Sequence, residues 1–104
     1  MIKTVLRYVE KELKAGEEYI EVACIKKHHD MTTAELFISL AGEELGHAER
    51  LLKQGQVLAD KIHPNKESPE YEHDIKCLAI WEWEKEKALE EIAELRADIH
   101  GFNH

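Results

Sequence analysis

The chemistry that this sequence can do centres on a Glu-x-x-His unit formed by Glu44 and His47. Side chains three residues apart lie on one face of a helix, one turn from each other. A carboxylate and an imidazole placed in this way can bind the same metal ion. Such units also occur by chance in charged helices, so the evidence that this unit binds a metal depends on its position and on the residues that face it.

Three long helices within a single domain, residues 1–104, are predicted to position this unit. Ala, Leu, Glu and Lys dominate the chain, which contains only two Pro and five Gly, and this composition favours helix over sheet. The spacing of apolar residues places the helices at about 2–28, 33–62 and 69–99. The short connection between the first two predicts an antiparallel hairpin, followed by a third long helix. The fold class is therefore all-α.

The helix boundaries carry their own signals. Thr32 is the predicted N-cap of the second helix, with Glu35 completing a capping box. Ser68 followed by Pro69 predicts the start of the third helix, and Gly101 predicts its end.

The apolar stripes along which the first two helices face each other, here called their seams, carry further candidate ligands for this unit. The predicted seam of the second helix comprises Phe37, Leu40, Glu44, His47, Leu51 and Leu58, flanked by Ala41, Ala48 and Leu52. The seam of the first helix includes Glu12 and, seven residues later, Tyr19. Counted from the connecting turn at about 1.5 Å per residue, the four polar groups fall in one layer. A carboxylate in an apolar seam is costly unless something pairs it, so a cation bound by Glu12, Glu44 and His47 is predicted.

Other acidic and histidine side chains are predicted to lie outside this layer. A second Glu-x-x-His unit, Glu70 and His73, falls at the end of the bundle, in the first turn of the third helix. Glu82 and Glu86 come nearer to the level of the site but lie off the centre of the apolar stripe. They are outer ligands or solvated residues.

Charge and cysteine content exclude several function classes. The net charge of −8 repels phosphate backbones, so no nucleic-acid partner is expected. No apolar run approaches the ~18 residues of a membrane span, and the charged first residues do not form a signal peptide. Cys24 and Cys77 are widely spaced, as in reduced proteins of the cytosol. We therefore expect a cytoplasmic protein without a membrane partner.

Residues 9–58 resemble the ferritin-like superfamily, including rubrerythrin-type and encapsulated-ferritin-type proteins. The resemblance rests on Glu12, on Tyr19 seven residues later, and on the run from Glu44 to Leu51. It implies that Glu12 and His47 are terminal metal ligands and that Glu44 is a bridging ligand. It also implies that Tyr19 lies beside the ligands as a catalytic group.

The chain supplies half of the ligands of such a site. A complete site takes one Glu from each of two helices and a Glu-x-x-His unit from each of two others. We therefore expect a homodimer, or a higher homo-oligomer, in which two hairpins form a ferritin-like four-helix core. The segment from Cys77 to Trp83 is apolar on most sides of its helix and predicts a further oligomer contact.

Four carboxylates and two histidines suit iron, with manganese or zinc as alternatives. The expected function is ferroxidase-like: two Fe(II) per dimer are bound and oxidised by O2 or peroxide, for iron storage or for handling oxidative stress. Two alternatives stay open. One is a non-catalytic helical assembly protein whose buried acids form hydrogen bonds with His47 and Tyr19. The other is a passive binder of divalent metals.

Overall fold

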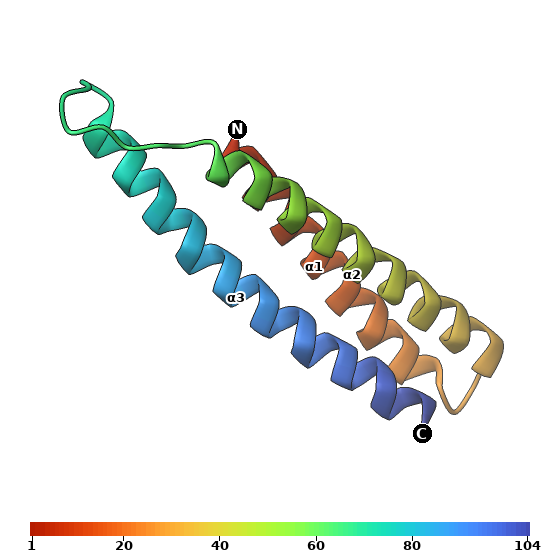
Figure 1. Cartoon of the computed structure of the whole chain (residues 1–104). Coiled ribbons are helices and arrows are strands. Elements are labelled where there is room, and N and C mark those ends of the chain that lie inside the picture. Colours follow the sequence, from red (N-terminus) through yellow and green to blue (C-terminus); the bar gives the residue numbers. More distant parts are fainter.

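Three helices form the fold of this protein, for which a computed structural model describes residues 1–104. α1 spans Ile2–Lys26, α2 spans Met31–Asp60 and α3 spans Tyr71–Asn103. α1 and α2 form an antiparallel hairpin, and α3 runs back beside it in the direction of α1 (Figure 1). The molecule is a rod of 63 × 18 × 16 Å. The all-helical prediction is confirmed.

α2 begins two residues earlier than predicted. Its N-cap is Asp30 rather than Thr32, because the Asp30 carboxylate accepts hydrogen bonds from the Thr33 hydroxyl at 2.6 Å and the Thr33 backbone N–H at 3.1 Å. These two bonds favour the ionised form and hold the pKa of Asp30 below its ordinary value. The cap therefore stabilises the fold above the ordinary pKa of an aspartate and loses this contribution as the pH falls through the lowered value.

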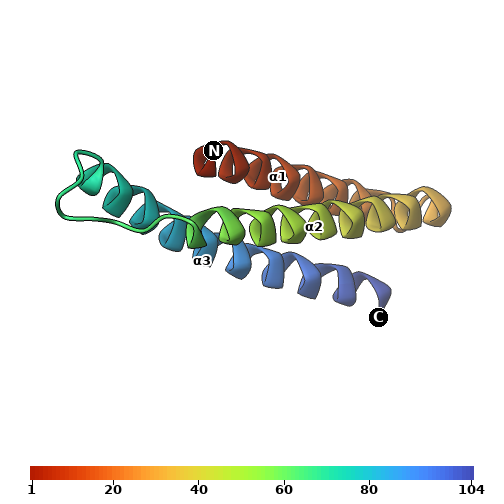
Figure 2. The ribbon, with the colours of Figure 1, turned by 45° about the horizontal axis from the view of Figure 1, so that its top comes forward.

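α3 is displaced toward the C-terminus relative to the predicted range 69–99. It begins at Tyr71, because the Ser68 hydroxyl accepts a hydrogen bond from the backbone N–H of Glu70 at 3.2 Å and forms a turn there. The helix continues through Gly101, which does not adopt a positive φ. The connection from α2 and the first turns of α3 extend past the end of the hairpin that carries the N-terminus (Figures 1 and 2).

The buried face of α2 corrects the predicted seam of the second helix. Two rows of buried positions repeat every seven residues along this helix: Ala34, Ala41, Ala48 and Gly55 in one row, and Ile38, Leu45, Leu52 and Ala59 in the other. Each of the predicted seam residues Leu40, Glu44 and His47 directly precedes a buried residue of α2. Since one residue turns a helix by about 100°, the predicted seam lies at the flank of the contact, where its residues are only half-buried. The small side chains of the first row let the two backbones approach closely, and the larger side chains of the second row fill the core beside them.

α3 packs on one side of the hairpin through Trp81, which is completely buried. Its indole N–H donates a hydrogen bond to Oε1 of Gln56 at 3.1 Å, and its ring lies against Gly55. Farther along α3, Arg96 forms an ion pair with Glu49 of α2. α3 also buries Ala88, Ile92 and Leu95, and Trp81 is the largest of these four buried side chains.

Substitution of Gly55 tests this packing. In Gly55→Ala the new methyl group would overlap the Trp81 ring and lie 3.2 Å from Cγ1 of Val5, so we expect a loss of about 1–3 kcal/mol in unfolding free energy. Gly42→Ala is the matched control, because nothing lies within 4 Å of its added Cβ. Helix propensity should stabilise this control by about 0.5–1 kcal/mol. Urea unfolding followed by circular dichroism measures both, and a gain in both variants would contradict the packing of Trp81 on Gly55.

Several large apolar side chains of α3 remain exposed, and Trp83 is 67% exposed. The chain thus covers the Trp81 side of the segment Cys77–Trp83 and leaves the Trp83 side open. The predicted oligomer contact at this segment stays a prediction. None of the three helices combines the length and the apolar character needed to span a membrane.

Candidate metal centre

Glu12 of α1 meets Glu44 and His47 of α2 near the middle of the hairpin, as the depth count predicts. Nδ1 of His47 lies 3.5 Å from Oε2 of Glu12 and 3.9 Å from Oε2 of Glu44. One ligand atom from each of the three residues lies within 4.8 Å of the other two. No other group of three or more His, Cys, Asp or Glu side chains in the chain is arranged in this way.

The cluster lies at the flank of the hairpin and is partly open to solvent. The side chains of Glu12 and Glu44 are 25% and 21% exposed, and that of His47 is 44% exposed. Oε2 of Glu12 is nevertheless buried and has no hydrogen-bond partner. The nitrogen of His47 at 3.5 Å is too far away for an ordinary hydrogen bond. Such an unpaired carboxylate oxygen destabilises the fold, and a cation bound to it would remove this cost.

The three side chains fit a divalent metal ion. Metal–nitrogen and metal–oxygen bonds of about 2.0–2.2 Å place neighbouring ligand atoms roughly 3 Å apart. Small side-chain movements would therefore close the observed distances around one ion. Two carboxylates and one imidazole suit Fe(II), Mn(II) and Zn(II), and the exposure of His47 leaves room for further ligands.

The cluster faces away from α3. Glu49, which pairs with Arg96 of α3, follows Glu44 by five residues, or about 140° around α2. On α1, Glu10 lines the groove between α1 and α3, and Glu12 is two residues later, about 160° away. α3 therefore cannot supply the ligands that the cluster lacks.

Tyr19, the predicted catalytic residue, lies two turns from Glu12 along α1, at an axial distance of about 10 Å. Its ring packs against the ring of Phe37, with centroids 5.7 Å apart and planes inclined by 60°. Tyr19 is not part of the three-residue cluster, and its catalytic role stays a prediction.

The acidic and histidine residues that were predicted to lie outside the layer of the cluster do lie elsewhere, on or beside α3. Glu82 and Glu86 are exposed on α3, and Glu82 forms an ion pair with Lys85 at 3.0 Å. Glu70 and His73 are exposed at the start of α3, which agrees with their predicted position at the end of the bundle.

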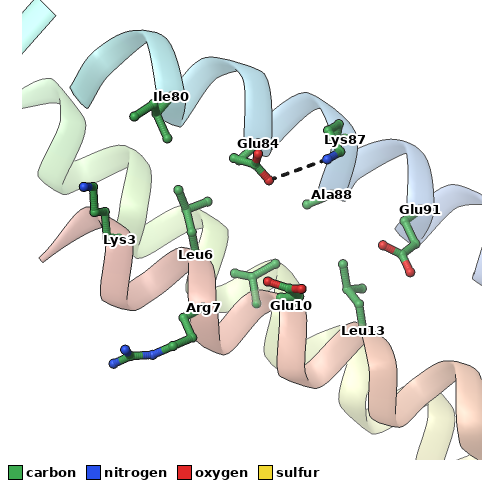
Figure 3. A pocket seen from close by; sticks show the side chains of 11 residues that line it. Lys3, Leu6, Arg7, Glu10, Leu13, Ile80, Glu84, Lys87, Ala88 and Glu91 are labelled. Atoms are coloured by element: carbon green, nitrogen blue, oxygen red, sulfur yellow. Dashed lines mark ion pairs between the residues drawn. The ribbon is translucent and has the colours of Figure 1, made fainter. Parts of the chain in front are cut away.

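A groove of about 600 Å³ lies between α1 and α3 (Figure 3). Its charged residues have both signs: Lys3, Arg7, Lys87, Glu10, Glu84 and Glu91. Burial first, and then the carboxylates of Glu17, Glu94 and Glu10, raise the pKa of Glu91. Ionised Glu91 thus destabilises the fold at neutral pH, and the penalty disappears as the pH falls through the raised pKa. The groove contains neither His nor Cys, and we do not assign a metal site to it.

No protein-family model, curated protein sequence or solved structure matches this chain. Its class is therefore defined by the fold and the cluster alone. It is a three-helix protein whose antiparallel hairpin carries two carboxylates and one imidazole close together on the side opposite α3.

Proposed function

We propose that this protein is a di-iron carboxylate protein with ferroxidase-like activity, whose metal centre is shared between two copies of the chain. The observation that carries the proposal is the convergence of Glu12, Glu44 and His47 around a buried carboxylate oxygen that has no hydrogen-bond partner. The resemblance of residues 9–58 to the ferritin-like superfamily suggests the class of reaction.

The face that carries the cluster is suited to a second copy. Half-buried apolar side chains flank the cluster along both helices: Tyr19, Phe37, Leu40, Leu51 and Leu58. Because α3 lies on the opposite side, this face has no partner within the chain. A two-fold axis through it would bring together two copies of Glu12, Glu44 and His47, giving four carboxylates and two imidazoles.

In this assembly each residue has a distinct role. Glu12 and His47 would be terminal ligands, each bound to a single iron, and Glu44 would bridge the two irons. Iron is the substrate: each Fe(II) loses one electron, and two irons together reduce O2 with two protons to hydrogen peroxide, or peroxide with two protons to two waters. The negative charge of the carboxylates stabilises the Fe(III) product more than Fe(II).

Anaerobic titration with Fe(II), followed by exposure to air, tests the proposal. We expect one iron per chain, two per dimer in solution, and oxidation to Fe(III) much faster than in buffer alone. Absence of iron uptake would refute the centre, and a monomer that binds two irons would refute the sharing between copies. Uptake with oxidation no faster than in buffer would favour a passive binder of divalent metals.

The hypothesis of a non-catalytic assembly protein requires the buried acids to be satisfied by hydrogen bonds. Oε2 of Glu12 has no hydrogen-bond partner, and His47 lies beyond ordinary hydrogen-bond distance from it. The geometry therefore supports the metal centre over this alternative.

Glu12→Gln separates metal binding from folding. The neutral amide has a similar shape but lower desolvation cost, so the metal-free variant is expected to match the native protein or exceed its stability by about 1 kcal/mol. Mn(II) or anaerobic Fe(II) should raise the melting temperature of the native protein, because metal binds only the folded state. The same metal ions should leave the melting temperature of Glu12→Gln unchanged.

Differential scanning fluorimetry with and without metal measures these shifts. Glu18→Gln is the control, because Glu18 lies on the same helix, is exposed and undergoes the same change of charge. This control should keep the metal-induced shift. A metal-free Glu12→Gln protein that is clearly less stable than the native one would contradict the unpaired state of Glu12.

A further inference from the structure

Four of the seven histidines lie at the end of the molecule where α1 and α3 both terminate: His28, His29, His100 and His104. The two helix ends are in contact, because Nζ of Lys27 donates a hydrogen bond to the carbonyl of Phe102 at 3.2 Å and lies 4.8 Å from the centre of its ring. Figure 1 shows the end of α3 beside the connection between α1 and α2. The carboxylate centre lies farther along the hairpin, so these histidines form a separate group.

Within this group, His100 and His104 form a close pair. Their ring centroids are 4.3 Å apart, with the planes inclined by 46°. Residues four apart lie on the same face of a helix, and α3 continues to Asn103. The backbone N–H of His104 donates to the carbonyl of Gly101 at 3.3 Å, which keeps the last residue on the helical path. The helix itself therefore places the two imidazoles side by side.

The chemistry of this pair differs from that of the carboxylate centre. Two imidazole nitrogens at about 2.0–2.1 Å from an ion form a chelate with no carboxylate ligand. Such a ligand set prefers Cu(II), followed by Ni(II) and Zn(II), over Fe(II) and Mn(II). The nearby ammonium group of Lys27, which donates to the carbonyl of Phe102, opposes the binding of a cation there. We therefore expect micromolar rather than nanomolar affinity.

We propose that His100 and His104 form a second metal site, specific for Cu(II), Ni(II) and Zn(II) and independent of the carboxylate centre. The ligand is a late first-row divalent cation bound by two imidazoles. The proposal does not depend on iron oxidation, since no residue of the pair belongs to the Glu12–Glu44–His47 cluster.

Titration with Cu(II) in a Glu44→Gln background, which weakens copper binding at the carboxylate centre, tests this site. We expect one Cu(II) per chain, bound with micromolar affinity, and an electron paramagnetic resonance spectrum with coupling to two imidazole nitrogens. His100→Ala and His104→Ala should each weaken binding at least about tenfold, because the second ligand of a chelate binds intramolecularly. His63→Ala, which removes an exposed histidine elsewhere, should have no effect.

Copper affinity unchanged in both His100→Ala and His104→Ala would overturn the proposal. So would a spectrum with coupling to one imidazole nitrogen, since it would assign the copper to a single histidine. Fe(II) uptake by the His104→Ala protein, measured separately, should equal that of the native chain, so failure of this site is distinguishable from failure of the carboxylate centre.

Discussion

Glu44→Gln is expected to abolish the catalysed oxidation of Fe(II) and to lower the affinity for Fe(II) at least about 100-fold. The proposed role of Glu44 is to bridge both irons, so its loss removes a ligand from each of them. Even residues that only support metal ligands contribute about 10–100-fold to metal affinity, and a bridging ligand should contribute at least as much. The amide keeps the size of the side chain, so the fold should persist.

The neighbouring residue provides the control for this variant. Glu43 is exposed, and Glu43→Gln changes the net charge by the same amount without touching the cluster. Rapid-mixing absorbance and metal analysis of gel-filtered protein should show native behaviour in Glu43→Gln and neither uptake nor oxidation in Glu44→Gln. Equal losses in the two variants would mean that iron associates with the acidic surface as a whole.

Trp81→Ala is expected to cost about 3–5 kcal/mol of unfolding free energy, the usual range for removal of a buried aromatic side chain. Trp81 is completely buried, its ring covers Gly55, and its indole N–H is bonded to Gln56. Domains of this size have a total stability of about 5–15 kcal/mol, so this one truncation should release α3 or unfold the chain. Trp83→Ala, which removes a side chain that is 67% exposed, should change stability by no more than about 0.5 kcal/mol.

Urea unfolding and hydrogen exchange of α3 measure the difference between the two tryptophans. If Trp81→Ala does not fold, Trp81→Phe keeps most of the ring and loses the hydrogen bond to Gln56, at an expected cost of about 1–2 kcal/mol. Iron uptake should survive in Trp81→Phe, because α3 lies on the other side of the hairpin from the cluster. Equal costs for the two alanine variants would contradict the docking of α3 through Trp81.

The level of each residue along the helix axes could be predicted from the sequence, whereas the exact rotation of each helix about its axis could not. Counting residues from the turn placed Glu12 level with Glu44 and His47, and their ligand atoms do converge. The predicted seam of α2 was wrong by one residue, because each of Leu40, Glu44 and His47 directly precedes a residue of the buried face. The buried face combines a row of small residues, from Ala34 to Gly55, with a row of mostly large ones, from Ile38 to Ala59. Both rows repeat every seven residues, and this shared spacing is the signal that identifies the face.

Two features of the candidate sites have no signal in the sequence pattern. The packing of Tyr19 on Phe37 depends on the rotation of both helices, which the spacing of residues does not determine. The pair of His100 and His104 depends on α3 continuing past Gly101. Because glycine usually marks the end of a helix, the sequence places His104 off the helix and separates the pair.

The hairpin carries the candidate metal-ligand cluster and the surface that binds α3 on opposite sides. Substitutions in well-separated regions without shared partners add within about 0.3–0.5 kcal/mol, so changes to α3 that keep its buried residues should leave the geometry of Glu12, Glu44 and His47 intact. For protein engineering, the exposed face of α3 can thus be redesigned or fused to a reporter while the same side chains remain in place on the other face of the hairpin.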